Sequence, residues 1–162
     1  MKNGVNPNWI EILFAYDNSP SSEGVNLASK YPYVRFFFYR KTPCDNYGYI
    51  PILRPDILEQ HFQRFPELSN EPIFYHDSDI IFRELPDFNK LLSDENWYFS
   101  DTVSYIGANY IKSKSEELFN NMCSIAGVSK EIVEMNESNS GGAQYLMKGI
   151  DQIGRASCRE RV

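Results

Sequence analysis

Blocks of apolar residues recur along the chain, separated by short polar segments, and they predict strands that alternate with helices. The run WIEILFAY, residues 9–16, ends at the turn-rich segment DNSPSS, so we expect a buried first strand there. The aromatic-rich run YVRFFFY, residues 33–39, predicts a second strand. Between these two runs, GVNLASK, residues 24–30, favours a short helix.

The segment RPDILEQHFQRF, residues 54–65, predicts a longer helix. Pro55 suits the first helical position, where the missing backbone N–H removes no helical hydrogen bond. Leu58, Phe62 and Phe65 recur at helical spacing. These three residues define an apolar face of the predicted helix.

The second half of the chain contains three more predicted strands. They are PIFYH, residues 72–76, WYFS, residues 97–100, and AQYLMKGI, residues 143–150. The apolar triplet at residues 80–82 is also strand-like, and LPDFNKLLSD after it favours a short helical turn. Strands therefore continue to alternate with helical segments.

A capping box marks the start of a further predicted helix. Ser113 with Glu116 matches that pattern and predicts a helix over 114–126 that ends at Gly127. SKEIVEM after it predicts a second, short helix. The face of the first helix that we expect to point inward holds Leu118, Met122 and Ile125.

This order of elements favours an α/β fold with a mostly parallel sheet flanked by helices. The 162 residues suit about one domain. The hydrophobic content is 42% and the aromatic content 15%, which favours a packed structure over a disordered one. We assign residues 1–152 to this domain.

The final segment differs from the rest of the chain. After Asp151 the sequence reads QIGRASCRERV and holds three arginines, whereas Arg83 is the one arginine in the preceding 86 residues. The string resembles adapter-derived sequence, so we interpret residues 153–162 as a non-native tail and expect the domain to be incomplete at its C-terminus. A natural basic tail is the alternative.

Charge and cysteine usage exclude some classes of function. The net charge of −6 disfavours general binding to nucleic acid, which requires a basic face. The chain has no apolar run of about 18 residues, so we expect no membrane span. Cys44, Cys123 and Cys158 are widely spaced and form no metal-binding pair, which favours free buried thiols and a cytoplasmic location.

The strongest candidate for chemistry is the acidic pair in FYHDSDIIF, where Asp77 and Asp79 follow an apolar strand. In an extended chain, residues two apart point to the same face, about 7 Å apart. Paired carboxylates at the carboxyl end of a strand suit Mn²⁺ or Mg²⁺, whose open positions phosphate oxygens can fill. The alternative is that both residues cap loop amides in a solvated turn.

Four segments resemble GT-A-fold glycosyltransferases over about residues 9–151. PIFYHDSDIIFRELPDF is similar to their metal-binding strand, DxD motif, short apolar strand and Pro-containing loop. WIEILFAYDNSP resembles their first strand and donor-binding loop, and NESNSGGAQYLMKGID resembles their acceptor-side Gly-Gly loop. YIPILRPDILEQHF is similar to the helix start that precedes the DxD in the hydroxyproline arabinosyltransferase-like branch.

The resemblance implies a GT-A-like sheet and transfer of a sugar from a nucleotide-diphosphate donor. The acceptor would be a hydroxyl on a glycan, a protein or a small molecule. Asp79 would bind the metal directly, and Asp77 would contact the ribose or a metal-bound water. On the donor side, the resemblance implicates Ala15, Tyr16, Asp17, Arg54, Asp77 and Ser78.

Further residues are implied for the acceptor side. Gly141 and Gly142 would let a sugar approach the backbone closely, and Gln144 would offer an amide to a sugar hydroxyl. Asp101 is the candidate catalytic base of an inverting enzyme. The alternative for the glycines is an ordinary loop, and for Asp101 a turn residue.

Two departures from the family keep other functions open. GT-A enzymes often use a C-terminal histidine as a further metal ligand, but the two histidines here, His61 and His76, lie at or before the DxD. A non-catalytic carbohydrate-binding or assembly protein on the same fold is therefore an alternative. A phosphoryl-transfer hydrolase that uses the Asp pair is another, although the chain continues with an apolar triplet where haloacid-dehalogenase-type phosphatases have a Gly-containing turn.

Overall fold

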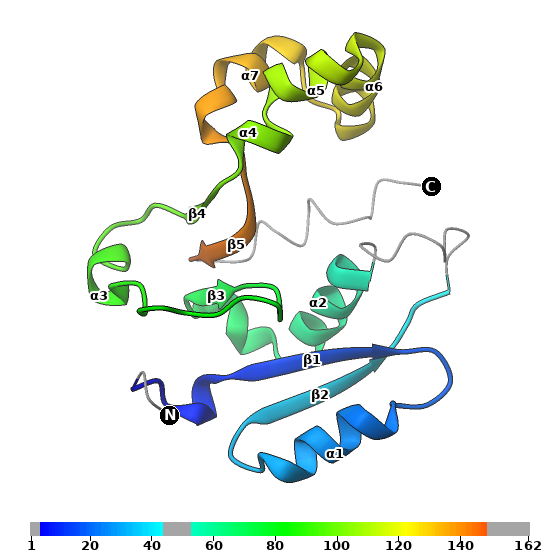
Figure 1. Ribbon diagram of the computed structural model, residues 1–162, viewed down its shortest axis with the longest axis vertical. Coiled ribbons are helices and arrows are strands. Elements are labelled where there is room, and N and C mark those ends of the chain that lie inside the picture. Colours follow the sequence, from blue (N-terminus) through cyan, green and yellow to red (C-terminus); the bar gives the residue numbers. More distant parts are fainter. Residues whose placement is uncertain (1–3, 44–52, 149–162) are drawn as a thin grey trace. The chain divides into compact units, whose positions relative to one another are not determined.

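The computed structural model describes residues 4–43 and 53–148 (Figure 1). The chain divides into two compact units, of which unit 1 includes the residues up to Glu71 and unit 2 spans Pro72–Lys148. In the described residues, no helix is both long and apolar enough to cross a membrane. The interpreted tail, residues 153–162, lies outside the described residues.

Unit 1 begins with a β–α–β arrangement (Figure 1). After a 3₁₀ turn at Pro7–Trp9, strand β1 spans Glu11–Tyr16, helix α1 spans Ser22–Lys30 and strand β2 spans Arg35–Arg40. The two strands are parallel and pair along their whole length. Both strands and the intervening helix confirm the sequence-based predictions.

Helix α1 packs closely against the side chains of this sheet. Gly24 is its buried residue, and a Cβ there would lie 3.2 Å from Cε1 of Phe38. The rings of Phe14 and Phe38 stack with centroids 5.3 Å apart. Ser21 caps the helix by accepting a hydrogen bond from Gly24 N at 3.1 Å. A larger residue at position 24 would therefore push α1 away from the sheet.

Two helical segments follow among the described residues of unit 1. Helix α2 spans Leu53–Arg64, as predicted, and the 3₁₀ segment η3 spans Pro66–Asn70. The ring of Phe65, at the end of α2, contacts that of Phe37 on β2 at a centroid distance of 5.1 Å. Aromatic packing thus joins α2 to the parallel strands.

Unit 2 is built on a three-stranded sheet of order β3–β5–β4. Strand β3 spans Ile73–Tyr75, helix α3 spans Phe88–Leu91, strand β4 spans Tyr98–Asp101 and strand β5 spans Gly141–Met147. Strand β5 is antiparallel to both neighbours, so β3 and β4 run in the same direction (Figure 1).

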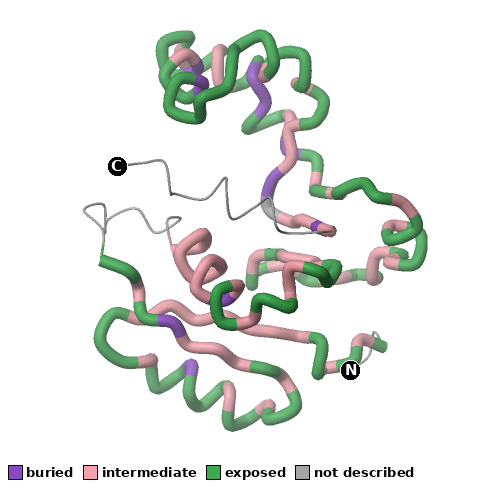
Figure 2. The backbone as a smooth tube through the Cα atoms, turned by 180° about the vertical axis from the view of Figure 1, so that it is seen from behind, coloured by how far each residue is buried: buried purple, intermediate pink, exposed green. Residues whose placement is uncertain are grey.

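A helical insertion, residues 103–139, separates β4 from β5 and is mostly exposed (Figure 2). Thr102 closes its base: the backbone N and Oγ1 of Thr102 donate to the carbonyl oxygen of Ser140 at 3.2 and 3.1 Å. The insertion consists of α4 (Val103–Ile106), α5 (Ala108–Lys114), α6 (Glu116–Ala126), α7 (Lys130–Met135) and the 3₁₀ segment η4 (Glu137–Asn139).

The prediction that Leu118, Met122 and Ile125 point inward is wrong. Their exposed fractions are 47%, 46% and 66%, whereas Phe119 and Cys123 are 1% and 6% exposed. Both sets recur at helical spacing, so the sequence of α6 contains two adjacent apolar stripes. The buried stripe is the one that packs with Ala108, Ile111 and Val133 of the neighbouring helices.

The predicted capping box is also misplaced. Ser113 lies inside α5, a helix that the sequence analysis did not predict. Ser115 caps α6 instead, by accepting from Leu118 N at 3.1 Å. Gly127 ends α6 as predicted, with the positive φ of 66° that favours glycine.

The α/β class is confirmed, but within residues 4–43 and 53–148 parallel pairing is observed only between β1 and β2, so the expected mostly parallel sheet is not seen there. The other three strands form an antiparallel sheet. The strand-like triplet at residues 80–82 forms no strand, and Ile81 is 92% exposed. Cys123 is a buried free thiol as predicted, while Cys44 and Cys158 lie outside the described residues.

Candidate functional site

The predicted metal and acceptor residues gather at one edge of the β3–β5–β4 sheet. Because β5 is antiparallel to both neighbours, its amino end lies beside the carboxyl ends of β3 and β4. The last pair of β3 is Tyr75 with Tyr145, and the last pair of β4 is Asp101 with Gly141. We call this end of the sheet the acidic edge: it comprises Asp77, Ser78 and Asp79 after β3, Asp101 on β4, and Gly141, Gly142 and Gln144 on β5.

The acidic pair lies in a turn, because β3 ends at Tyr75. Asp77 is half-buried, whereas Ser78 and Asp79 are exposed. The alternation of side chains along a strand therefore does not extend to Asp79. The prediction that Asp77 and Asp79 point to the same face, which requires an extended chain, does not apply. The turn is held locally by His76, whose Nδ1 donates to the carbonyl oxygen of Asp77 at 2.8 Å.

An aromatic cluster supports this turn. The ring of Phe74 lies 6.0 Å from that of Phe82 and 5.4 Å from that of Phe88 in α3. The His76 ring meets Phe82 edge-on at 5.3 Å. These contacts join β3, the segment after the DxD and α3. The acidic pair is thus carried by a packed loop that is anchored on both sides.

The described residues hold no closed metal site. In the ranges 4–43 and 53–148, no three His, Cys, Asp or Glu side chains come together as a possible metal-binding group. A structural zinc site would need more protein ligands than the two aspartates of the turn. Mg²⁺ is usually bound by only one or two carboxylates together with water and phosphate oxygens. Binding of Mn²⁺ or Mg²⁺ by Asp77 and Asp79 therefore stays a prediction.

Asp101 has a structural contact of its own. Its Oδ1 accepts a hydrogen bond from Val103 N at 3.0 Å, at the start of α4. The residue is exposed, at the last position of β4. One carboxylate oxygen therefore helps the chain to turn into the helical insertion, and Oδ2 is the oxygen that remains for a role as a base.

The two glycines of β5 have packing roles. A Cβ on Gly141 would lie 1.8 Å from Cδ2 of Phe99, so the aromatic ring occupies the space above this glycine. A Cβ on Gly142 would lie 3.0 Å from Cγ2 of the buried Thr102. Absence of a side chain is thus required by the protein itself at Gly141, and the acceptor role of both glycines stays a prediction.

The predicted donor-side residues Ala15, Tyr16 and Asp17 lie at the carboxyl end of β1 in unit 1. Ala15 and Tyr16 are half-buried and Asp17 is exposed. Lys41 Nζ pairs with Asp17 Oδ2 at 3.0 Å, and Arg40 Nε donates to the Asp17 carbonyl oxygen at 3.0 Å. Two cationic side chains therefore stand at this end of the parallel sheet, where α/β proteins commonly bind ligands.

Arg54 is half-buried in the first turn of α2. The same turn contains Asp56, whose carboxylate accepts from Thr42 N at 2.9 Å and from Thr42 Oγ1 at 2.6 Å. These bonds tie the start of α2 to the segment after β2. Arg54 is thus placed in unit 1, on a helix end that is anchored to the chain leaving β2.

The sequence analysis missed a buried polar network centred on His61, which is 3% exposed. Its Nδ1 lies 2.6 Å from Tyr39 Oη, and its Nε2 lies 2.6 Å from Glu11 Oε2. Glu11 Oε1 pairs with Arg35 Nη1 at 2.5 Å. Burial raises the pKa of Tyr39 above its ordinary value. The sequence contains one sign of this network: His61 is a polar residue next to the apolar face of the predicted helix.

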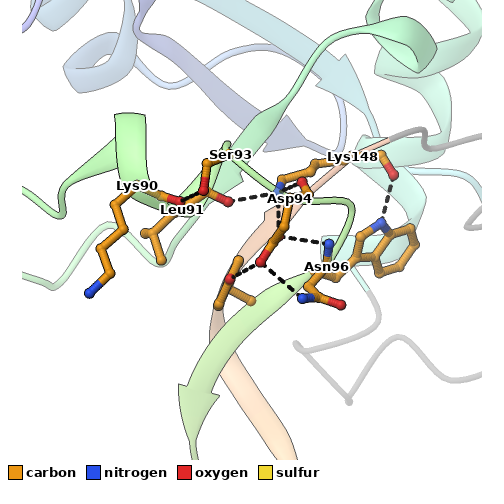
Figure 3. A network of polar contacts seen from close by, with 8 residues as sticks. Lys90, Leu91, Ser93, Asp94, Asn96 and Lys148 are labelled. Atoms are coloured by element: carbon orange, nitrogen blue, oxygen red, sulfur yellow. Dashed lines mark hydrogen bonds and ion pairs between the residues drawn. The ribbon is translucent and has the colours of Figure 1, made fainter.

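A second network, shown in Figure 3, ties the far end of β5 to the loop before β4. Lys148 Nζ donates to the carbonyl oxygens of Leu91, at 2.6 Å, and of Asp94, and to Asp94 Oδ1 at 3.1 Å. Tyr98 Oη donates to Asp94 Oδ2 at 2.6 Å, and Asn96 N donates to Asp94 Oδ1 at 2.9 Å. The Tyr98 hydroxyl, followed by the Asn96 amide, holds the pKa of Asp94 well below its ordinary value.

Comparison with protein-family models, curated proteins and solved structures found no match to the chain. Function therefore has to be inferred from side chains and their geometry. Of the three polar regions, the two networks contact mainly groups of the protein itself. The acidic edge presents exposed carboxylates beside the end of a sheet, and it is the better candidate for binding a ligand.

Proposed function

We propose that the chain is a metal-dependent glycosyltransferase that moves a sugar from a nucleotide-diphosphate donor to an acceptor hydroxyl. The observation that carries the proposal is the acidic edge. The Asp77–Ser78–Asp79 turn directly follows β3, at the same edge as the carboxyl end of β4 and the amino end of β5. The family resemblance of these segments supports the same reaction, and no comparison with known proteins adds to it.

The two aspartates of the turn have different exposures, which suits different roles. Asp79 is exposed and would bind Mn²⁺ or Mg²⁺ directly. Asp77 is half-buried and would contact the ribose or a metal-bound water, with Ser78 between them on the donor side. When bound, the cation would neutralise negative charge on the leaving diphosphate. The aromatic packing under the turn would keep both carboxylates in place.

For unit 1 taken by itself, the family resemblance implies nucleotide contacts by Ala15, Tyr16 and Asp17, and a pairing of Arg54 with phosphate oxygens through two N–H groups. Asp101 would act as the base that accepts the acceptor proton at Oδ2, because Oδ1 is engaged with the backbone. Cys123 as a free thiol fits a reducing compartment, so we propose a cytoplasmic enzyme.

Binding of Mn²⁺, followed by calorimetry with and without UDP or GDP, tests the proposal together with turnover of nucleotide sugars. Asp79→Asn should weaken Mn²⁺ binding by at least about tenfold. The matched control is Glu84→Gln, which removes the same charge from an exposed position in the same loop and should bind like the wild type. Wild-type protein that binds no Mn²⁺ and turns over no nucleotide sugar would contradict the proposal.

A non-catalytic carbohydrate-binding protein is the second candidate. Exposed aromatic side chains favour it: Phe99, Tyr105 and Tyr110 are 44%, 52% and 38% exposed, and aromatic rings stack on sugar faces. The two candidates differ in their need for metal. Glycan binding that persists in EDTA, with no turnover of nucleotide sugars in Mn²⁺, would favour the binding protein.

A further inference from the structure

Strand β5 contains a two-residue bulge beside the acidic edge. Along β4 the ladder advances by one residue, from Phe99 to Ser100, while the partner on β5 changes from Tyr145 to Gly142. Residues 143–144 therefore have no partner in the described ladder with β4. Bulges of this kind leave backbone groups unpaired, and they are common next to active sites.

The bulge also lies beyond the last pair of β3. That pair is Tyr75 with Tyr145, after which the chain of β3 turns into the Asp77–Asp79 segment. On β5, the residue that precedes Tyr145 is Gln144. The acidic turn thus follows Tyr75 along the chain, and the bulge precedes Tyr145, the residue that pairs with Tyr75. Both lie at the same edge of the sheet.

One hydroxyl group spans the bulge. Ser100 Oγ donates to the carbonyl oxygen of Gly142 at 2.7 Å and accepts from Gln144 N at 3.4 Å. Ser100 is half-buried, so water competes only partly for these bonds. The short bond to Gly142 is the stronger of the two. Ser100 thereby ties Gly142, which precedes the unpaired segment, to Gln144 within it.

Loss of this hydroxyl would permit a different register. In a regular ladder, Ser100 would pair with Gln144 and Asp101 with residue 143, which is a shift by two residues. Because side chains alternate with a period of two, such a shift keeps every residue on its face of the sheet. The slip would move Asp101 by about 7 Å along β5. It is opposed by the Ser100 hydroxyl and by the two bonds from Thr102 to Ser140.

We propose that Ser100 is a positioning residue: it holds the 143–144 bulge so that the side-chain amide of Gln144 binds hydroxyl groups of the donor sugar, in place of the acceptor-side role that the family resemblance implies for Gln144. This proposal rests on the proposed function of the acidic edge. An amide side chain both donates and accepts hydrogen bonds, as a sugar hydroxyl does. Asp77 and Asp79 then bind the cation, which binds the diphosphate. Gln144 forms hydrogen bonds with the sugar that is attached to the diphosphate.

Three variants test this role: Ser100→Ala, Ser100→Thr and Gln144→Ala. The probes are Mn²⁺ alone, then UDP-glucose and GDP-mannose in the presence of Mn²⁺. The expected result for Ser100→Ala is an unchanged affinity for Mn²⁺ and about tenfold weaker binding of whichever nucleotide sugar the wild type accepts, equivalent to the loss of one hydrogen bond. Exchange of the Gln144 amide hydrogen, followed by NMR, should be faster.

The conservative variant separates positioning from general damage. Ser100→Thr keeps the hydroxyl and should restore both donor affinity and slow exchange. Gln144→Ala should weaken donor binding to a similar extent without accelerating exchange of its own amide, and it keeps the test valid if Ser100→Ala does not fold. Circular dichroism melting of each variant checks folding.

Failure of the positioning role can be distinguished from failure of the proposed function. If the wild type binds Mn²⁺ and a nucleotide sugar, but Ser100→Ala and Gln144→Ala bind that sugar as tightly as the wild type, the positioning role is overturned and the proposed function stands. If the wild type binds neither Mn²⁺ nor either nucleotide sugar, both are overturned.

Discussion

The His61 network and the acidic edge both gather titratable side chains, but they differ in what surrounds them. His61 is 3% exposed, and both of its ring nitrogens contact other side chains of unit 1. Asp79 and Asp101 are exposed, and Asp77 is half-buried. A polar group that is saturated inside the protein contributes to stability, whereas exposed carboxylates at a sheet edge remain accessible to a ligand. The same residue types are therefore enclosed by protein partners in one region and exposed in the other, where we propose that they bind a ligand.

The largest effect on stability is expected from His61→Ala. Removal of the ring leaves the buried Tyr39 hydroxyl and Glu11 Oε2 without their contacts to His61, although Glu11 keeps its pair with Arg35, and it opens a cavity; it should lower the free energy of unfolding by about 3 kcal/mol. Urea denaturation measures this change. Gln63→Ala, on the exposed side of the same helix, is the control and should stay within about 0.5 kcal/mol of the wild type. Equal stability of His61→Ala and the control would show that the network is not stabilising.

The next largest expected effect is a gain in stability on addition of Mn²⁺, which should depend on the acidic edge and not on the His61 network. If the acidic edge binds Mn²⁺ only in the folded state, Mn²⁺ at about 100 times its Kd should stabilise the wild type by about 2.7 kcal/mol. The Asp79→Asn variant should show little of this gain and yet unfold like the wild type in EDTA. A thermal-shift titration measures both. An equal Mn²⁺ response in Asp79→Asn and the wild type would place the metal elsewhere.

Tyr39→Phe should have a smaller effect, about 1–2 kcal/mol, because it leaves one buried ring nitrogen of His61 without a partner. The variant should also change the alkaline limb of the stability profile. Burial raises the pKa of Tyr39 in the folded state, so its contribution is complete below the unfolded pKa of about 10 and is lost as the pH rises through the folded pKa. Denaturation between neutral and alkaline pH should therefore show less loss for Tyr39→Phe than for the wild type.

The elements of both units that depend on local pattern could be predicted from the sequence. The apolar runs of β1 and β2, the helical period of α2 and the terminating Gly127 all act within a few residues. The acidic turn was visible for the same reason, since its two aspartates are one residue apart.

Features that depend on residues far apart in the sequence could not be predicted. His61 is 22 residues from Tyr39 and 50 from Glu11, and nothing local to α2 indicates either contact. The buried stripe of α6 is set by the helices that pack on it, so Phe119 rather than Leu118 faces the core. The bulge of β5 likewise involves a distant contact, because Ser100 lies 42 residues before its hydrogen-bond partner Gly142.

The Asp94 network is intermediate between the two regions, because it is accessible like the acidic edge but saturated like the His61 network. The bond from Tyr98 is the main cause of the lowered pKa of Asp94, so Tyr98→Phe should raise that pKa toward the ordinary value. A lowered folded pKa gives stability that is present above the unfolded pKa, about 3.9, and is lost as the pH falls through the folded pKa. The variant should therefore lose less stability than the wild type in that acid range.

An NMR titration of carboxyl carbons measures the pKa of Asp94, and a titration with Mn²⁺ compares Asp94 with Asp79. Mn²⁺ is paramagnetic and broadens signals of the groups that bind it. Asp79 is expected to broaden at low Mn²⁺ concentration, whereas Asp94, whose oxygens already accept bonds from Tyr98, Asn96 and Lys148, is expected to stay sharp. Equal broadening of the two signals would mean that exposed carboxylates of this chain attract Mn²⁺ without selection. Selective broadening of Asp79 would mean that the turn after β3 is a metal-binding site. Both carboxylates are accessible to solvent, so the difference would come from the hydrogen bonds that already occupy the oxygens of Asp94.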